Sequence, residues 1–502
     1  MMTLSNYTFT PMLSDYFFYL IVIILFAGIF FTVRKPHLRA PWGRVFTRPI
    51  AMVSAVLIFS YMIFGLFDSV HFKYAGHSPA KVSSVQTACP SGYGVYTPAA
   101  MQYRAHSILD MLFYKVNSVS ESRYSAPLAL TEYDPNNIKK DSVKSNGKYY
   151  RRLCYSGAND LSSSRLGDIS LRLLKGALFA VVLVFLALLI VYLCRFIILM
   201  MKKVSYSDAA KQLSRCWADL FLGRKKYAWR SAFFTFLVVI VFISILYQLS
   251  LNYHVLGTDK IGQDILYVAL KSIRTGLIIG FVSILFMLPF ALCFGLFAGY
   301  YGGWVDDLIQ YIYTTVSSIP GVLLISACLL ILRSYINTPS QAVSILGFSL
   351  SDSASRDDIQ FLGLCAILGL TGWAGLCRLL RAESIKLRMQ PFVTASKALG
   401  QRSFFVIFKH ILPNVLHIIL ITVVLDFSGL VLAEAVLTYV GVGVPSSIHS
   451  WGNMINSARF ELSRAHVVWW PLASAMFFMF LFVLSINLFA DSVRDAFDPR
   501  VD

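Results

Sequence analysis

Charged residues are scarce in this 502-residue sequence: Asp, Glu, Lys and Arg make up 14% of it, against roughly 25% in soluble proteins. Apolar residues make up 57%, so too few polar side chains are available to cover a soluble domain, and a disordered chain is excluded as well. Glycine, at 30 residues, is too rare for collagen, and 8 cysteines are too thinly spread for a small disulfide-stabilised scaffold. Long apolar runs remain, which predict a polytopic membrane protein.

Three motifs of enzyme chemistry are absent from the sequence. The pair Gly147-Lys148 is followed by Tyr149, and Ser142 stands where the first glycine of a phosphate-binding P-loop would lie. Neither an HExxH nor a GxSxG motif occurs, and the nine histidines show no metal-ligand spacing. We therefore predict no catalytic residue, no metal site and no bound cofactor, and we expect any driving chemistry to come from another subunit.

Nine apolar segments are each near the ~20 residues that a helix needs to cross the hydrocarbon core. They predict an all-α fold, because backbone groups in lipid must be hydrogen-bonded within the segment. The predicted spans cover about residues 16–33, 49–67, 172–200, 231–251, 275–299, 311–333, 361–380, 415–440 and 471–490.

Lys and Arg concentrate in three of the connecting loops, at residues 34–48, 201–230 and 381–414. Short basic loops stay in the cytoplasm, so nine spans place the N-terminus outside and the C-terminus inside. The same bias explains the net charge of +18. We therefore expect the positive charge to reflect association with the lipid bilayer, and we expect no nucleic acid as a partner.

Composition divides the chain into four parts. They are residues 1–67 with two spans, 68–171 with a polar extracytoplasmic segment, 172–230 with a third span and a basic linker, and 231–502 with six spans and short loops. Cys89 and Cys154 both lie in the polar segment, where an oxidising compartment favours a disulfide between them. The alternative is two free thiols in a loop.

Residues 392–414 form a cytoplasmic loop in which small residues precede a glycine and a proline. The small residues are Ala395, Ser396 and Ala398. They predict a short helix of low bulk, which Gly400 can end, and Pro413 stands where the next span begins. Such a helix suits close docking by another protein, although by itself the pattern fits an ordinary solvated helix better.

The stretch Phe392-Val-Thr-Ala-Ser-Lys-Ala-Leu-Gly400, with His410-Ile-Leu-Pro-Asn414 downstream, resembles the EAA loop of ABC importer permeases. It is most similar to the C-type permease subunit of dipeptide and oligopeptide importers, with Thr394 in place of the family's Glu. The resemblance implies that ATPase subunits dock on this loop. The implied docking residues are Thr394, Ala395, Ser396, Ala398, Gly400, Ile411, Leu412 and Pro413.

Further segments resemble motifs of the same family in the family's order. They are Leu256–Asp264, Gly299–Asp306, Ile319–Leu324, Leu432–Gly443 and Arg494–Arg500. The resemblance covers about residues 230–500 and implies a six-helix permease core. The first 230 residues show no such resemblance, and they add about three spans and the extracytoplasmic insert.

The resemblance also implies the protein's partners and its location. A subunit of this kind imports di- or oligopeptides across the bacterial inner membrane, together with a second homologous permease, two ATPase subunits that hydrolyse ATP, and an extracytoplasmic substrate-binding protein. The residues implied to face the binding protein are Gly257, Thr258, Asp259, Gly262 and Asp264. Apolar residues at helical spacing predict that residues 252–274 form a helix at the outer membrane surface.

Two acids lie inside the eighth predicted span. Asp426 and Glu434 are about two turns apart and about 80° around the helix. An intramembrane acid normally faces a cavity or a partner, so either residue is a candidate to line the translocation path and meet a peptide's ammonium group. Alternatively, Glu434 braces a neighbouring helix; it stands at a family position, whereas Asp426 matches no family acid.

Other functions make different demands on the sequence. A nickel complex or an antimicrobial peptide is an alternative cargo for the same kind of permease. An ATP-independent secondary transporter is expected to carry inverted repeats, and we find none in the sequence. A membrane-bound enzyme needs a clustered site in residues 68–171, where His71, His77, His106 and Asp110 are widely scattered.

Overall fold

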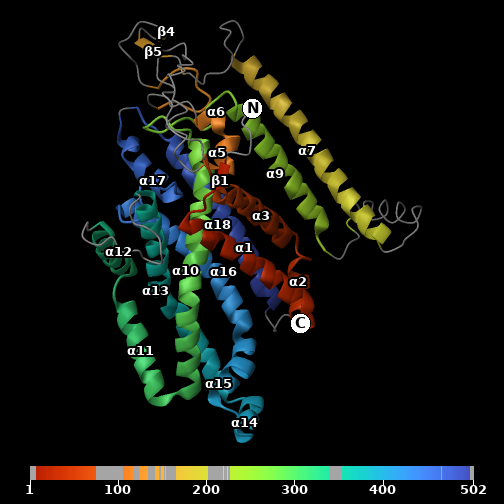
Figure 1. Cartoon of the computed structure of the whole chain (residues 1–502), viewed down its shortest axis with the longest axis vertical. Coiled ribbons are helices and arrows are strands. Elements are labelled where there is room, and N and C mark those ends of the chain that lie inside the picture. Colours follow the sequence, from red (N-terminus) through yellow and green to blue (C-terminus); the bar gives the residue numbers. More distant parts are fainter. Residues whose placement is uncertain are drawn as a thin grey trace. The chain divides into compact units, whose positions relative to one another are not determined.

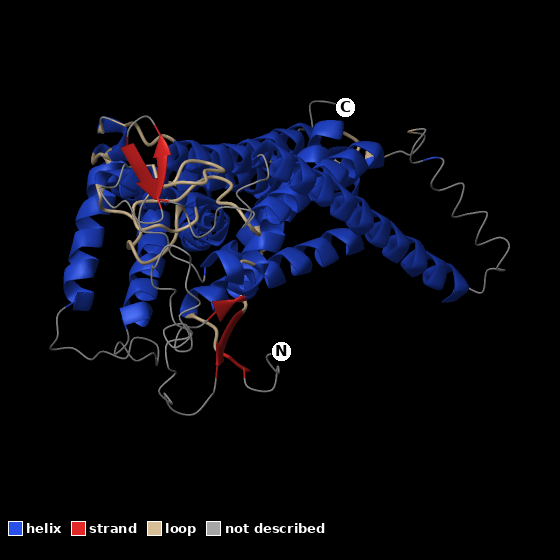
Figure 2. Ribbon diagram, turned by 90° about the horizontal axis from the view of Figure 1, so that it is seen from above, coloured by secondary structure: helices blue, strands red, loops and turns tan. Residues whose placement is uncertain are grey.

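Helices dominate the computed structural model of the chain (Figures 1 and 2). It describes residues 7–74, 106–117, 124–133, 142–145, 148–151, 153, 165–201, 219, 223, 227–337, 353–464 and 466–497. Within these ranges, 8 helices are long and apolar enough to cross a membrane, or up to 9 spans when a bent pair is counted as one. The predicted all-α polytopic class is therefore confirmed.

The long helices correspond one by one to the predicted spans. The first four are α1 (Leu13–Arg34), α3 (Pro49–Ser69), α7 (Arg165–Met201) and α9 (Trp229–Ser250). The others are α10 (Ile265–Tyr301), the pair α11 (Gly303–Ser318) and α12 (Gly321–Asn337), α13 (Ser353–Arg388), α16 (Leu412–Val440) and α18 (Trp470–Phe497).

Short elements connect these helices. The helical ones are α2 (Pro36–Val45), α5 (Ile108–Leu112), α6 (Tyr114–Asn117), α14 (Pro391–Ala398), α15 (Ser403–Val406), the π-helix Ile407–Ile411, α17 (Trp451–Arg459) and the 3₁₀ turn Glu461–Ser463. Strands β1 (Tyr7–Phe9), β2 (His71–Tyr74) and β3 (His106–Ser107) form an antiparallel sheet in that order, and β4 (Ser142–Ser145) pairs with β5 (Lys148–Arg151).

The span predicted over residues 311–333 is present as a bent pair of helices. The chain bends by 88° between α11 and α12. Pro320 lies at the bend, and a proline removes one helical N–H donor while its ring clashes with the preceding turn. The result is a broken span or a re-entrant segment.

The prediction of a surface helix over residues 252–274 is wrong before Ile265. Turns occupy that part, and the 37-residue helix α10 begins only at Ile265. Gly257 and Gly262 adopt positive φ angles of 78° and 81°. The Asp259 carboxylate accepts hydrogen bonds from the backbone N–H groups of Ile261 (2.8 Å) and Gln263 (3.0 Å). These local bonds compete with helix formation.

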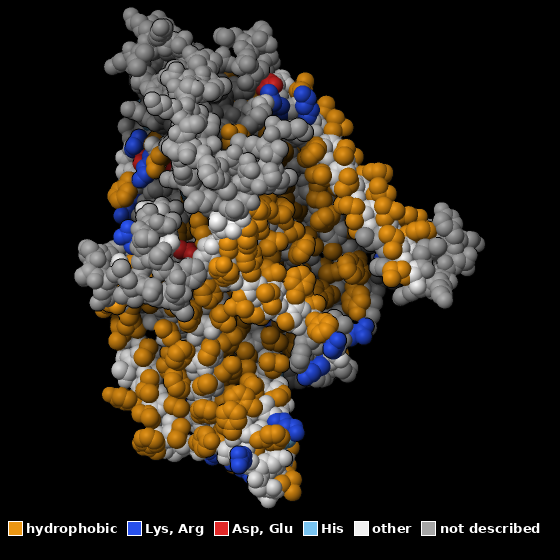
Figure 3. All heavy atoms as spheres, in the orientation of Figure 1, with side chains coloured by type: hydrophobic (Ala, Val, Ile, Leu, Met, Phe, Trp, Pro, Cys, Tyr) orange, Lys and Arg blue, Asp and Glu red, His pale blue; other side chains and the backbone are white. Residues whose placement is uncertain are grey.

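The chain divides into two compact units. The first comprises Met1–Thr10, Thr32–Lys271 and Arg464–Ser492, and the second comprises Pro11–Phe31, Ser272–Ser463 and Val493–Asp502. In the first unit α7 lies beside α9 (Figure 1). Apolar side chains cover much of the surface drawn in colour in Figure 3, as expected of helices that face lipid.

In the second unit, glycines let α10 and α13 approach closely. A Cβ atom on Gly295 would lie 2.8 Å from the Cβ of Leu380, and one on Gly369 would collide with the Ser283 carbonyl oxygen. Small residues at such crossings allow the backbone contact that holds membrane helices together.

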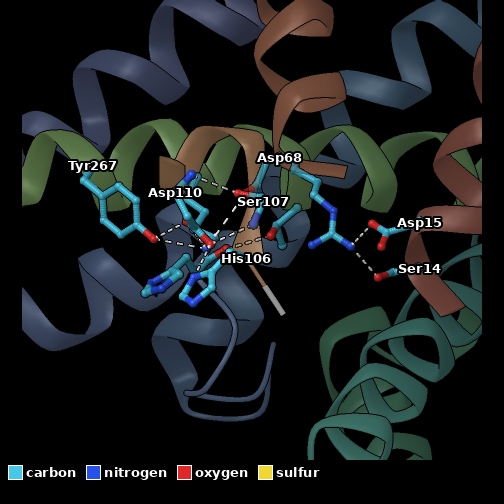
Figure 4. Close-up of polar contacts among 11 residues, drawn as sticks. Ser14, Asp15, Asp68, His106, Ser107, Asp110 and Tyr267 are labelled. Carbon is cyan, nitrogen blue, oxygen red and sulfur yellow. Dashed lines mark hydrogen bonds and ion pairs between the residues drawn. The ribbon is translucent and has the colours of Figure 1, made fainter. Parts of the chain in front are cut away.

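A buried ion cluster in the first unit joins α5 of the polar insert to the beginning of α10 (Figure 4). The Asp110 carboxylate accepts hydrogen bonds from the Lys271 ammonium (2.7 Å), the Tyr267 hydroxyl (2.5 Å) and the Ser107 N–H (3.0 Å). Asp68, at the end of α3, lies 3.9 Å from the same ammonium. The insert is therefore fastened to this helix by charge.

The charge of Asp110 makes a pH-dependent contribution to stability. Burial by itself would raise the pKa of Asp110, but Lys271 and the hydrogen bonds from Tyr267 and Ser107 outweigh burial and lower this pKa to about 2. Because the pKa is depressed, the contribution is complete above the ordinary value of 3.8 and is lost as the pH falls toward 2. We expect the unfolding temperature of the detergent-solubilised chain to exceed that of Asp110→Asn at neutral pH, and this difference to shrink in acid. A difference that stays constant down to the lowest pH tested would contradict this role.

In the second unit, the first turn of α1 is tied to two core helices. The Arg274 guanidinium donates hydrogen bonds to the Asp15 carboxylate (2.5 Å) and to the Ser14 hydroxyl (2.6 Å), as Figure 4 shows. The Ser14 N–H donates to the Asp358 carboxylate on α13 (2.9 Å). Part of the N-terminal extension therefore packs as an integral part of the core.

Candidate functional site

Helix α14 forms the middle of the predicted coupling loop. Pro391 begins it, and Gly400, with φ of 76°, provides the left-handed turn after its last residue. The predicted short helix that ends at a glycine is therefore present. An 8-residue helix is too short to be stable by itself, so its position depends on contacts with the rest of the unit.

Three contacts hold α14 in place. Val393 is fully buried. The buried Ser396 hydroxyl donates to the Gln401 side-chain oxygen across the Gly400 turn (2.6 Å). The Lys397 ammonium lies 4.5 Å from the ring centre of Tyr300, in the last turn of α10. Helix α14 therefore contacts α10 directly through Lys397 and Tyr300.

The predicted docking residues fall into two groups. Thr394, Ala395, Ala398, Gly400 and Pro413 are exposed, and Leu412 is half-buried. Ser396 and Ile411 are buried and serve to hold the loop together instead. Within α14 the division follows the helical period, because Val393 and Ser396 are buried three residues apart on one side of the helix.

Sequence reasoning missed the most exposed apolar residues of this region. Leu399 is 80% exposed, Phe404 is 63% exposed, and Phe392 is also exposed. We call these three exposed residues and the neighbouring Gly400 the coupling patch: Phe392, Leu399, Gly400 and Phe404. The available signal was a group of large apolar residues within a basic loop, because a cluster of exposed apolar residues in a polar region marks an interaction site.

The neighbouring turn between α10 and α11 is fixed by charge. Arg381 of α13 pairs with both carboxylate oxygens of Asp306, at 2.5 and 2.6 Å. Arg388 donates to the Tyr300 carbonyl oxygen (3.1 Å). This end of α13 therefore holds the same turn of α10 that Lys397 contacts.

The residues predicted to face a binding protein are partly inaccessible. Thr258 is fully buried, and the buried carboxylate of Asp264 lies 2.8 Å from the His254 ring nitrogen Nδ1. Gly257 and Gly262 are also buried, and Asp259 is half-buried. The exposed positions of this loop are Lys260, Ile261 and Gln263.

The two acids of α16 have different surroundings. Glu434 is buried and accepts a hydrogen bond from the Thr438 hydroxyl (2.7 Å). A Cβ atom on Gly452 of α17 would lie 2.7 Å from the Glu434 carboxylate, so this acid packs against α17. Asp426 is half-buried, and no described residue forms an ion pair or a hydrogen bond with its carboxylate.

A polar stripe on α11 is a further feature that sequence reasoning missed. Its exposed members are Asp307, Gln310, Thr314, Ser317 and Ser318. Their spacing of three, four, three and one residues places them on one side of the helix. Ile309 and Tyr313 are buried on the other side. The same spacing was visible in the sequence.

Two further predictions concern a disulfide and a metal site. Cys89 and Cys154 lie outside the described residues, so their pairing stays a prediction. Across the described ranges, the structure contains no group of three or more His, Cys, Asp and Glu residues that could hold a metal ion.

Sequence comparison identifies the family. The family described as "binding-protein-dependent transport system inner membrane component" matches residues 291–502. The chain is 33% identical over 248 residues to the dipeptide transport system permease protein DppC of Alkalihalophilus pseudofirmus, covering 49% of this chain and 72% of that protein. The chain belongs to this family of transport permeases.

Other relatives of the permease are also peptide-type proteins. The oligopeptide transport system permease protein OppC of Bacillus subtilis is 27% identical, over 49% of this chain and 72% of that protein. The glutathione transport system permease protein GsiD of Pectobacterium atrosepticum is 30% identical, over 49% of this chain and 73% of that protein. The resemblance noted in the sequence is thus confirmed: the permease is of the ABC peptide-importer type.

An inward-facing structure of the methionine ABC transporter MetNI matches 46% of the permease and 97% of its own chain. The TM-score is 0.33 and the identity 16%, which is too low to support a conclusion about the fold.

Proposed function

We propose that this permease imports di- or oligopeptides across the bacterial inner membrane by alternating access. Two separate ATPase subunits drive it, a second homologous permease completes the pathway, and a substrate-binding protein delivers cargo. The coupling loop and the C-terminus are cytoplasmic, and the N-terminus and the polar insert lie outside. The observation that carries the proposal is the exposed coupling patch in and around the short helix α14, whose Lys397 contacts Tyr300 of α10.

The contacts of α14 support this mechanism. A ligand shifts a conformational equilibrium only by binding one state better than the other. An ATPase that binds the coupling patch differently in its open and closed forms meets that condition. Val393 and Lys397 fasten α14 to the unit, and the Ser396 hydrogen bond stiffens the loop itself, so a displacement of α14 is passed to the core.

Asp426 and the polar stripe of α11 are our candidates for the translocation path. Asp426 is 14 residues from either end of α16, or about 21 Å at 1.5 Å per residue, which is near the middle of the span. A carboxylate there without a described partner suits an ammonium group in a watery path. Polar side chains such as Gln310 and Thr314 are poorly suited to lipid.

Reconstitution tests the proposed function. The permease complex in vesicles should accumulate peptide only when ATP, both ATPases and the second permease are present. Full-rate uptake by the purified chain alone would refute the proposal, as would a location of residues 392–414 outside the membrane. Co-purification of the partners in mild detergent is the supporting measurement.

Asp426→Asn tests the path. We expect it to reduce uptake of peptides with a free amino terminus about tenfold, because a charge-assisted hydrogen bond contributes roughly 1.5–3 kcal/mol. Uptake of the same peptides with an acetylated amino terminus serves as the control and should change little. An equal loss for both forms would show that Asp426 supports the structure and does not meet the ammonium group.

A further inference from the structure

The polar insert is built into the loop that precedes α10. Segment 124–133 of the insert reaches this loop through Ser125, whose N–H donates to the Thr258 hydroxyl oxygen (2.7 Å). The Thr258 N–H donates to the Ser125 carbonyl oxygen (3.1 Å). A side chain on Gly257 would collide with that same carbonyl oxygen. The insert therefore covers the motif residues from one side.

The same segment also contacts the loop that precedes α18. The Tyr133 hydroxyl donates to the Val467 carbonyl oxygen (3.3 Å), and its ring packs edge-to-face on Trp470 with ring centres 5.0 Å apart. The Trp470 indole N–H donates to the Thr258 carbonyl oxygen (3.1 Å). Three segments distant in sequence thus meet around Thr258.

A turn with an unusual backbone conformation lies within the insert segment. The Ala129 N–H donates to the Ala126 carbonyl oxygen (3.1 Å), with Pro127 and Leu128 between them. Leu128 has a φ of 54° and is the only described non-glycine residue with positive φ. Glycine is strongly preferred at this third position of a turn. The Leu128 N–H donates to the His254 carbonyl oxygen (2.9 Å), which holds this conformation against the loop that precedes α10.

Four apolar residues lie in the three segments that meet at these contacts, and three of them are exposed. Leu128 of the insert is half-buried, while Ile261 and Trp469 are 58% and 57% exposed. Val467 is exposed beside Trp469. We call Leu128, Ile261, Val467 and Trp469 the insert patch. Its exposed neighbours Lys260, Arg464 and His466 are basic or can become so.

We infer that the substrate-binding protein docks on the insert patch, and not on the buried motif residues Thr258 and Asp264. This inference rests on the proposed function, which places these loops outside and requires a binding protein. The basic rim of the insert patch defines the partner. It is a soluble extracytoplasmic protein with an apolar contact surface bordered by carboxylates, which pair with Lys260. The N-terminal extension thereby supplies part of the recognition surface.

Stimulation of ATP hydrolysis tests the docking surface. The assembled complex in lipid nanodiscs is titrated with the purified substrate-binding protein. We expect Leu128→Gly and Ile261→Ser to raise the concentration for half-maximal stimulation tenfold or more, since loss of a central apolar contact has effects of this size. Glycine fits the Leu128 conformation, so this variant removes the side chain while retaining the turn.

Leu112→Ser is the matched control. Leu112 is an exposed leucine in α5 of the same insert and is not part of the insert patch. It should keep the wild-type half-maximal concentration. Stimulation that is unchanged in both patch variants would overturn the docking surface and leave ATP-driven import intact. If the binding protein does not stimulate ATP hydrolysis even in the wild-type complex, both the docking surface and the proposed function would be overturned.

Discussion

Gly400→Val is expected to reduce ATP-driven uptake at least tenfold while the complex still inserts and hydrolyses ATP. Gly400 has a φ of 76°, a conformation that a β-branched residue hardly adopts. The left-handed conformation costs an ordinary residue roughly 1–2 kcal/mol. We expect the turn to rearrange and to displace Leu399 and Phe404 relative to α14. The measurement is the ratio of peptide transported to ATP hydrolysed in proteoliposomes.

Gly400→Asn separates the conformation from the added side chain. Asparagine is similar in size to valine but tolerates positive φ much better. We therefore expect Gly400→Asn to retain most of the coupling ratio. If both variants lose uptake equally, added bulk at the ATPase contact is responsible rather than the backbone turn. Unchanged uptake in Gly400→Val would refute the coupling assignment.

Lys271→Met is expected to destabilise the chain by about 3–5 kcal/mol, because it leaves buried carboxylates without their cation. Asp110 and Asp68 are both buried, and Lys271 is the ammonium that contacts them. Methionine keeps most of the apolar side chain, so the loss of charge is the main change. The measurement is the unfolding temperature of the full chain in detergent at neutral pH.

The double variant Lys271→Met with Asp110→Asn is the matched control. Removing one uncompensated charge should restore part of the lost stability, so the two effects should not add. Lys271→Arg, which keeps the positive charge, should lower the unfolding temperature much less than Lys271→Met does. An unfolding temperature of Lys271→Met equal to that of the wild type would show that the cluster does not fasten the insert.

Local patterns in the sequence were sufficient for the helices and for the family. Apolar runs near 20 residues predicted each membrane helix, since chain length and hydropathy decide whether a segment can span a bilayer. The motif around Gly400 predicted a short helix and its end, because only a few residue types adopt a left-handed turn readily. Both signals depend on residues that are close together along the chain.

The tertiary structure decided which of those residues remain accessible. Thr258 and Asp264 belong to a motif that looked like a contact surface, yet the insert segment around Ser125 covers this loop. Ser396 stands in the docking motif but its hydroxyl faces Gln401. Burial depends on neighbours contributed by distant segments, and a local pattern contains no information about them.

The ion cluster at the start of α10 illustrates the same limit. The sequence alone determined that Asp110 and Lys271 are charged and that one lies in a polar segment and the other in a helix. Only the fold brings them to 2.7 Å, across 161 residues of chain. Because the strength of an ion pair depends on separation and on burial, neither of which is local in sequence, only the tertiary structure could decide that these charges join the insert to the permease helix.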